Sequence, residues 1–247
     1  MKYYNSKIGT QKFILSDVDS TNNFAAKLIN DGLGGHGSVI MAENQTNGRG
    51  QQGSLWQSNS KLNLLVSLIL SSTELSKVNP IHINWYISVC IIDFLKSKKI
   101  SAQVKWPNDI IADSLKISGI LIENKFAGSK LKSSVVGVGI NVSQLTFNGL
   151  SATSMKLQTG ENYSIDALLD DFIFHLNTNE YRIYLGQDEV LKDRYLSSLF
   201  GLNEERVFSS KSKSFRGKIV GVDDAGRLLV ESNGDVLCFQ NKEVQFL

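Results

Sequence analysis

One run of apolar residues, LNLLVSLIL at residues 62–70, restricts the folds open to this chain more than any other segment. Its length suits a single β-strand, and apolar side chains occupy both of the faces that alternating residues present. A strand of this kind is stable only when both faces are covered by other elements. The run therefore predicts a buried strand inside a larger sheet.

The neighbouring patterns supply other strands and the covering helices. Residues 12–31 read as a short strand, a turn and a helix with Phe24, Leu28 and Ile29 at near-helical spacing. Strand-like segments also occupy residues 38–44, 102–106, 118–126 and 132–143, and the last two are joined by a polar loop. Apolar residues recur at helical spacing in residues 82–98 and 164–185 as well. Ser20, Thr21 or Asn22 is expected to cap the first of these helices. The pattern predicts an α/β (α+β) fold built on a mixed sheet.

The carboxyl end follows a different pattern. From about Glu204, short strand-like segments such as FRGKIVGV and RLLVES are separated by tight turns such as DDAG and NGD. We therefore predict two domains, a mixed-sheet α/β domain over residues 1–199 and a small β-barrel over residues 200–247.

Composition excludes several classes of protein. The 247 residues hold 26 Lys and Arg against 24 Asp and Glu, so the balance of charge does not favour nucleic acid or a membrane surface as a partner. No apolar run approaches the length of a membrane span or a signal peptide, so we expect a cytoplasmic protein. Cys90 and Cys238 lack metal-ligand spacing and are expected to be packed thiols.

The segment NGRGQQGSLW at residues 47–56 is the first candidate site. Gly48, Gly50 and Gly53 allow the backbone to approach a ligand closely, and Arg49 adds a guanidinium suited to phosphate or carboxylate. The letters match GxGxxG, but a strand rather than a helix follows, so the generic dinucleotide motif is weak evidence. A simple loop with turn glycines remains open as an alternative.

Three other segments carry polar groups suited to a site. VKWPND at residues 104–109 is a stiff turn with Asn108 and Asp109 at its tip, and Lys116 follows just before the next strand. GVGIN at residues 137–141 leaves room beside a strand for a flat ligand, and DSTNN at residues 19–23 gathers small hydrogen-bonding groups. Each segment has an ordinary structural explanation when taken alone.

Taken in order, these segments resemble the ordered motifs of the biotin protein ligases. The resemblance rests on DSTNN, ENQTNGRGQQGSLW, VKWPND, LKISGILIE and GVGIN, and it extends to the carboxyl-terminal domain, for which it implies an SH3-like β-barrel. It implies an ATP-dependent enzyme that makes biotinyl-5'-AMP and transfers biotin to a lysine of a biotin carboxyl carrier domain. It also implies that ATP and Mg²⁺ accompany biotin, with no dedicated metal cage in the protein.

The resemblance assigns roles residue by residue. The expected biotin-binding residues are Ser20, Thr21, Asn22, Gln45, Gly48, Trp56 and Gly119. The expected ATP- and adenylate-binding residues are Arg49, Gly50, Gln51, Lys105, Asn108, Lys116 and Asn141. Lys116, Arg49 and Asp109 are the expected catalytic residues: the two cations stabilise charge at the phosphate, and Asp109 orients or deprotonates the acceptor lysine.

The chain departs from the family pattern in two places. Gln51 and Gln52 stand where the family loop is often GRGRRG, which predicts weaker retention of the adenylate. Only sixteen residues precede Asp17, too few for the helix-turn-helix domain of the bifunctional members, so we expect no binding to DNA. Homodimerisation through a sheet edge is a further expectation.

Three alternatives remain open at this point. A lipoate protein ligase shares the general fold and the adenylate chemistry, but Ser20, Thr21 and Gln45 suit a ureido ring better than a dithiolane. A non-catalytic biotin or nucleotide sensor would have no need of both Arg49 and Lys116. A nucleic-acid-binding protein could use SSKSKSFRGK at residues 209–218, but this segment lacks interleaved aromatic residues.

Overall fold

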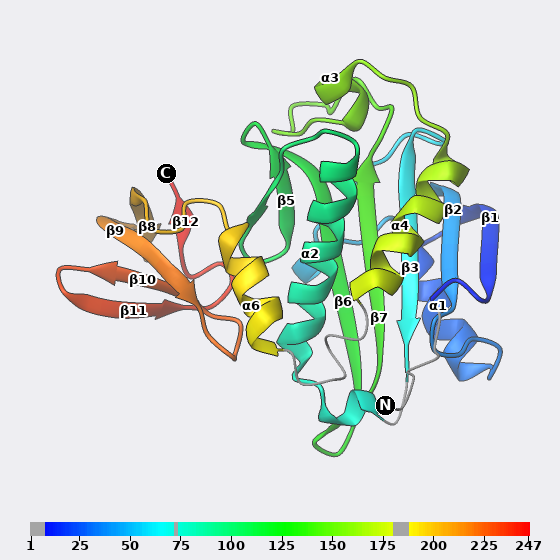
Figure 1. Cartoon of the computed structure of the whole chain (residues 1–247), viewed down its shortest axis with the longest axis horizontal. Helices are drawn as coiled ribbons and strands as arrows, with labels where there is room; N and C mark the ends of the chain where they lie inside the picture. The colour runs from blue at the N-terminus through cyan, green and yellow to red at the C-terminus, as the bar shows by residue number, and fades with distance from the viewer. Residues whose placement is uncertain (1–7, 72–73, 180–187) are drawn as a thin grey trace.

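The computed structural model describes residues 8–71, 74–179 and 188–247, and places two β-sheets side by side with helices packed mainly on the larger one (Figure 1). The larger sheet has seven strands in the order β1-β2-β3-β7-β6-β5-β4, of which β1 and β2 are parallel and the remaining neighbours antiparallel. Its strands are β1 (Lys12–Val18), β2 (Val39–Gln45), β3 (Asn63–Leu70), β4 (Gln103–Lys105), β5 (Asp109–Ala112), β6 (Leu115–Ala127) and β7 (Lys130–Asn141). The predicted mixed sheet is confirmed.

Strand β3 is the buried strand that the apolar run predicts, because all eight of its residues are buried. Its two faces meet different helices. Leu64, Val66, Leu68 and Leu70 belong to the main core, with α2 (Pro80–Ser97) and α4 (Ile165–Asn179), whereas Ile69 packs with α1 (Thr21–Asn30). Figure 1 shows α2 and α4 on one face of the sheet. The face that carries α1 also carries Ser67 and the site described below.

The carboxyl-terminal sheet is antiparallel, with five strands in the order β11-β10-β9-β8-β12, and fits an SH3-like fold. Its strands are β8 (Glu205–Ser210), β9 (Lys213–Val222), β10 (Leu228–Ser232), β11 (Asp235–Phe239) and β12 (Gln245–Phe246). Phe208, Ile219 and Val230 belong to the same apolar cluster as the main core, and Trp106 Nε1 donates to the Gly226 carbonyl at 2.9 Å. The two sheets are therefore packed together; the domain boundary at residue 200 stays a prediction.

Several local predictions differ from the structure. Ser20 occupies the position before α1, but its side chain makes no capping hydrogen bond. Cys90 is buried as expected, whereas Cys238 is exposed, so the prediction of a packed thiol there is wrong: its strand β11 lies at the edge of its sheet. Only residues 165–179 of the predicted long helix lie in α4, and residues 180–185 are outside the described part.

Shorter helical elements complete the described chain. Helix α6 (Asp188–Ser197) lies against α2 and buries Leu191 and Tyr195, and helix α3 (Met155–Thr159) follows β7. Two 3₁₀ turns are η1 (Gln51–Gly53) and η2 (Glu74–Lys77). No helix of the described segments is long and apolar enough to cross a membrane.

Candidate active site

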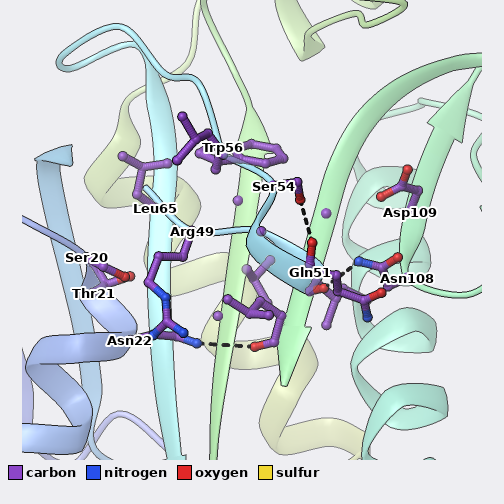
Figure 2. A pocket seen from close by; sticks show the side chains of 18 of the residues that line it. Ser20, Thr21, Asn22, Arg49, Gln51, Ser54, Trp56, Leu65, Asn108 and Asp109 are labelled. Atoms are coloured by element: carbon purple, nitrogen blue, oxygen red, sulfur yellow. Dashed lines mark hydrogen bonds between the residues drawn. The ribbon is translucent and has the colours of Figure 1, made fainter. Parts of the chain in front are cut away.

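A cavity of about 300 Å³ opens on the α1 face of the large sheet. Its walls come from the start of α1, the segment between β2 and β3, the turn before β5, and strands β3, β6 and β7. Twelve of the residues predicted from the sequence line it: Ser20, Thr21, Asn22, Gln45, Arg49, Gly50, Gln51, Trp56, Asn108, Asp109, Lys116 and Gly119. Figure 2 shows many of these side chains converging on one space.

Buried polar side chains form one end of the cavity. Gln45 Oε1 accepts from the Thr21 backbone N–H at 2.8 Å and from the Thr21 hydroxyl at 3.0 Å. The hydroxyl of Ser67 on β3 lies 2.7 Å from Thr21 Oγ1 and 2.6 Å from Asn22 Oδ1. The hydroxyl of Ser20 makes no hydrogen bond within the described residues, although Ser20 is 2% exposed. This end of the cavity is therefore ordered in advance and keeps a free polar group for a ligand.

The indole of Trp56 lies on a floor of glycines. Gly119 on β6 and Gly139 on β7 are direct partners in the sheet, and a Cβ atom on Gly139 would stand only 2.5 Å from Trp56 Cε2. A Cβ atom on Gly119 would stand 3.0 Å from Trp56 Cζ3. The room that GVGIN leaves beside its strand is thus filled by the protein's own tryptophan. Trp56 also closes one wall of the cavity (Figure 2).

Two ion pairs lie in or beside the cavity. Lys116 Nζ is 2.6 Å from Asp109 Oδ1, and this ammonium also lies 5.5 Å from the centroid of the Trp56 ring. Arg49 binds both carboxylate oxygens of Glu123, at 2.7 and 3.2 Å, and donates to Asn23 Oδ1 at 2.7 Å. Glu123 in turn accepts from Asn22 Nδ2 at 2.8 Å. Both predicted catalytic cations are therefore held by carboxylates.

The glycine segment forms a compact loop over the cavity. Arg49 and Leu55 form an isolated antiparallel bridge, Gly50 N donates to the Ser54 carbonyl at 2.7 Å, and the Ser54 hydroxyl donates to the Gln51 carbonyl at 2.8 Å. A Cβ atom on Gly50 would stand 2.5 Å from Ser54 Oγ, so a side chain there would displace the Ser54 hydroxyl from its contact with Gln51. The loop is thus a built turn that presents Arg49 and Gln51, which favours a site over a plain connection.

Three predicted site residues do not line the cavity. Gly48 packs against the backbone of Trp56, where a Cβ atom would stand 2.5 Å from the Trp56 carbonyl oxygen. Lys105 lies 5.7 Å from the centroid of the Phe246 ring. Asn141 is buried and donates from Nδ2 to the carbonyls of Lys116, at 3.3 Å, and Thr153, at 2.9 Å. In this state Asn141 supports the backbone of Lys116.

The sequence did not single out several residues that the structure brings to the site. Ser67 donates to Asn22 at the polar end of the cavity, and Glu123 pairs with Arg49. Both residues lie in segments that the sequence predicts as strands. Asn241 and Lys242 line the cavity from the carboxyl-terminal sheet. No sequence pattern links these two residues to the glycine loop.

A metal site of protein ligands alone is absent from the described part of the chain. No group of three or more His, Cys, Asp or Glu side chains in it is arranged to hold an ion. Asp109, the one carboxylate among the residues that line the cavity, is paired with Lys116. This donor set does not form the oxygen cage that Mg²⁺ or Ca²⁺ needs.

Comparison with known proteins identifies the family. The model of the biotin/lipoate A/B protein ligase family matches residues 15–141, just over half of the chain. The chain belongs to this family. It is 27% identical over 243 residues to the bifunctional ligase/repressor BirA of Bacillus subtilis, covering 95% of this chain and 74% of the relative. It is 24% identical over 226 residues to the biotin–[acetyl-CoA-carboxylase] ligase of Paracoccus denitrificans, covering 88% and 92%.

Solved structures agree on the fold of this family member. The biotin protein ligase of Aquifex aeolicus in complex with biotin and ATP superposes with a TM-score of 0.78 at 24% identity, covering 96% of this chain and 99% of the other. The biotin protein ligase of Leishmania major in complex with biotinyl-5-AMP gives a TM-score of 0.61 at 20% identity, covering 94% and 99%. The predicted fold class is confirmed over both sheets.

Proposed function

We propose that this chain is a biotin protein ligase, which uses ATP to activate biotin as biotinyl-5'-AMP and transfers the biotin to a lysine of a biotin carboxyl carrier domain. The observation that carries this proposal is one cavity with hydrogen-bonding side chains at one end and Arg49 and Lys116 nearby. The names of the relatives from Bacillus subtilis and Paracoccus denitrificans support the same activity.

The polar end of the cavity favours biotin over lipoate. A ureido ring offers two N–H donors and a carbonyl acceptor, which suit the Ser20 hydroxyl, Thr21, Asn22 and Gln45. A dithiolane ring would leave the buried Ser20 hydroxyl without a partner, at a cost of about 1–3 kcal/mol, whereas Thr21, Asn22 and Gln45 already bond within the protein. Trp56 would then cover the apolar part of the bicyclic ring, with Gly119 and Gly139 beneath it.

The proposed first step joins the biotin carboxylate to the α-phosphorus of ATP and breaks the bond to pyrophosphate. Lys116 would face the developing negative charge with its ammonium, and Arg49 would meet the carboxylate and phosphate. The approach of the substrates requires both cations to exchange part of their present carboxylate contacts, with Asp109 and Glu123, for phosphate oxygens. Mg²⁺ is proposed to arrive with ATP, where it neutralises the phosphates.

In the proposed second step the acceptor lysine attacks the acyl carbon, and AMP leaves. A free lysine has a pKa near 10.4 and is protonated at neutral pH, so it must lose a proton before it attacks. Asp109 is the carboxylate in the cavity lining that can orient the lysine or receive this proton. The loop at Gly50 and Gln51 would exclude water from the reactive anhydride.

The remaining predicted roles stay proposals of a narrower kind. Asn108 and Gln51 are proposed to contact the nucleotide from the cavity lining, whereas Gly48, Lys105 and Asn141 are proposed to act from outside that lining. Weak retention of the adenylate at Gln51 and Gln52 stays a prediction. Homodimerisation also stays a prediction; β1 is an outer strand of the large sheet and is exposed at Ile14.

The test of the first step is biotin-dependent exchange of labelled pyrophosphate into ATP. Lys116→Ala should lower this exchange by about 100-fold or more, because a preorganised cation at the phosphate is lost. Lys130→Ala, at the exposed far end of the same β6–β7 hairpin, is the matched control and should leave exchange unchanged. Exchange with lipoate or octanoate in place of biotin would reassign the pocket, and no exchange with any acid would favour a sensor.

A further inference from the structure

The last turn of the carboxyl-terminal sheet forms part of the cavity. Asn241 and Lys242, between β11 and β12, line the same space as Ser20, Arg49 and Lys116. Asn241 Nδ2 donates to Gln51 Oε1 at 2.9 Å. The glycine loop is therefore in direct contact with a residue that lies 190 positions further along the chain.

The turn holds Lys242 in a defined place. The Gln240 backbone N–H donates to Glu243 Oε2 at 2.7 Å, and the Glu243 N–H donates to the Gln240 carbonyl at 3.0 Å. Val244, at the end of the turn, is buried in the core that both sheets share. Lys242 itself has a φ of 70° and an exposed side chain at the tip. The backbone beneath this lysine is thus fixed on both sides.

Lys242 differs from the other cations of the cavity because it has no carboxylate partner in the described part of the chain. Arg49 is paired with Glu123 and Lys116 with Asp109, so each already faces a carboxylate. Lys242 makes no ion pair or hydrogen bond with any described residue, and it is the remaining cation of the lining. Gln51 and Gln52, at the tip of the glycine loop, carry no charge. The cavity therefore has one unpaired positive charge, and it comes from the carboxyl-terminal sheet.

The location of this charge indicates what it binds. Figure 2 shows Gln51 and Asn108 on the side of the cavity away from Ser20 and Thr21. Asn241 ties the turn to Gln51, so Lys242 stands toward that same side. Under the proposed function, Ser20 and Thr21 hold biotin, and the opposite end receives the nucleotide. A flexible ammonium on a fixed turn suits a phosphate chain, whose oxygens accept from several directions.

We propose that Lys242 binds the β- and γ-phosphates of ATP, and the pyrophosphate they become, so that the carboxyl-terminal sheet supplies a positive charge missing from Gln51 and Gln52. This inference rests on the proposed ligase function. Lys242 forms and breaks no covalent bond in it. Its ammonium neutralises the leaving group, and Asn241 keeps the turn against the loop.

Lys242→Ala tests the proposal in the pyrophosphate exchange assay. The KM for ATP and the KM for pyrophosphate should each rise about 5- to 10-fold, the loss expected for one partly exposed charged contact, while the KM for biotin stays unchanged. Lys242→Arg, which keeps the charge, should stay near the wild type. Lys211→Ala is the matched control, because Lys211 is also exposed with a positive φ, of 48°, in the turn between β8 and β9.

Calorimetry gives a second readout that does not depend on catalysis. The probes are α,β-methylene-ATP, which cannot release pyrophosphate, and AMP, which lacks both outer phosphates, each titrated with biotin present and absent. Lys242→Ala should weaken binding of the first probe about 5- to 10-fold and leave the second unchanged.

The outcomes separate this proposal from the proposed function. Equal affinity of Lys242→Ala and the wild type for α,β-methylene-ATP would overturn the role of Lys242, and so would an equal loss for AMP or biotin, which would indicate a structural effect. Failure of the wild-type protein to catalyse exchange with biotin would instead overturn the ligase function, and the calorimetric comparison would still decide whether Lys242 binds phosphates.

Discussion

Lys116 and Asp109 lie on two neighbouring strands and meet at 2.6 Å, with side chains 35% and 31% exposed. The β5–β6 pairing has a register shift between Ile110 and Ile111. Because of this shift Lys116 pairs with Ile111; a regular ladder would pair it with Ala112. A partly exposed pair of this kind contributes little to stability, commonly below about 1 kcal/mol. Under the proposed function, its importance is to hold the ammonium and the carboxylate of the two steps in one place.

Asp109→Asn should slow biotin transfer more than adenylation. Asparagine keeps the shape of the side chain but cannot accept the proton of the acceptor lysine, and a lost general base costs about 100-fold. Lys116 keeps its charge for the first step. Single-turnover measurements of adenylate formation and of its transfer to a carrier domain give the two rates, and equal losses in both would count against this role.

Sequence reasoning grouped residues that lie in the same motif or in adjacent strands. Arg49, Gln51 and Trp56 share one loop and line one cavity, while their roles in binding stay predictions. It could not reveal Glu123 as the partner of Arg49, because a carboxylate within a strand pattern has no signal of its own. Asn141 was expected to contact a ligand, but in the structure its amide nitrogen donates to two backbone carbonyls. These partners depend on tertiary packing, which the local sequence does not reveal.

At the scale of elements, the glycines of β6 and β7 determine where the Trp56 loop rests. Gly119 and Gly139 face each other across the two strands, and the indole fills the space that two side chains would occupy. The sequence indicated a flat group beside this strand but not that the group belongs to the protein. The sequence also did not predict helix α6, which buries only Leu191 and Tyr195 and so has a weak apolar pattern.

Gly139→Ala should disturb this contact directly. Its methyl group would stand 2.5 Å from Trp56 Cε2, so the indole must shift, at a cost of about 1–3 kcal/mol. We expect a lower melting temperature and a higher KM for biotin. Gly35→Ala is the control, since a Cβ atom there meets nothing within 4 Å. An unchanged KM for biotin in Gly139→Ala would show that Trp56 does not shape the pocket.

The packing of α4 against α2 predicts a pH dependence. Burial of the His175 imidazole lowers its pKa below the ordinary value, although Asp93 and Asp171 oppose this shift. Because protonation then favours the unfolded chain, the contribution of His175 is complete above its unfolded pKa of 6.5 and is lost as pH falls toward its folded pKa.

The His175→Gln variant has no imidazole to protonate at this position. Its free energy of unfolding should therefore fall less on acidification than that of the wild type. Urea unfolding at about pH 8 and about pH 5.5, on either side of the ordinary histidine pKa, measures this difference. The same loss of unfolding free energy in both proteins would contradict the assignment to His175.

At the scale of the whole molecule, one core joins the two sheets and one cavity uses residues from both. Trp106, in the turn before β5, donates a hydrogen bond to the Gly226 carbonyl, and Asn241 donates one to the Gln51 side chain. The sequence predicts the two β regions from their turn spacing, but not their contact, because no local pattern encodes which distant segments meet. This contact between the two sheets brings Asn241 and Lys242 into the cavity lining.

The most direct measurement of the central claim is the intact mass of a biotin carboxyl carrier domain after incubation with this protein, biotin, ATP and Mg²⁺. We predict the addition of one biotin at a single lysine, with no addition when ATP is left out or when lipoate replaces biotin. An unmodified carrier domain, or one that gains lipoate instead, would contradict the assignment of this chain as a biotin protein ligase.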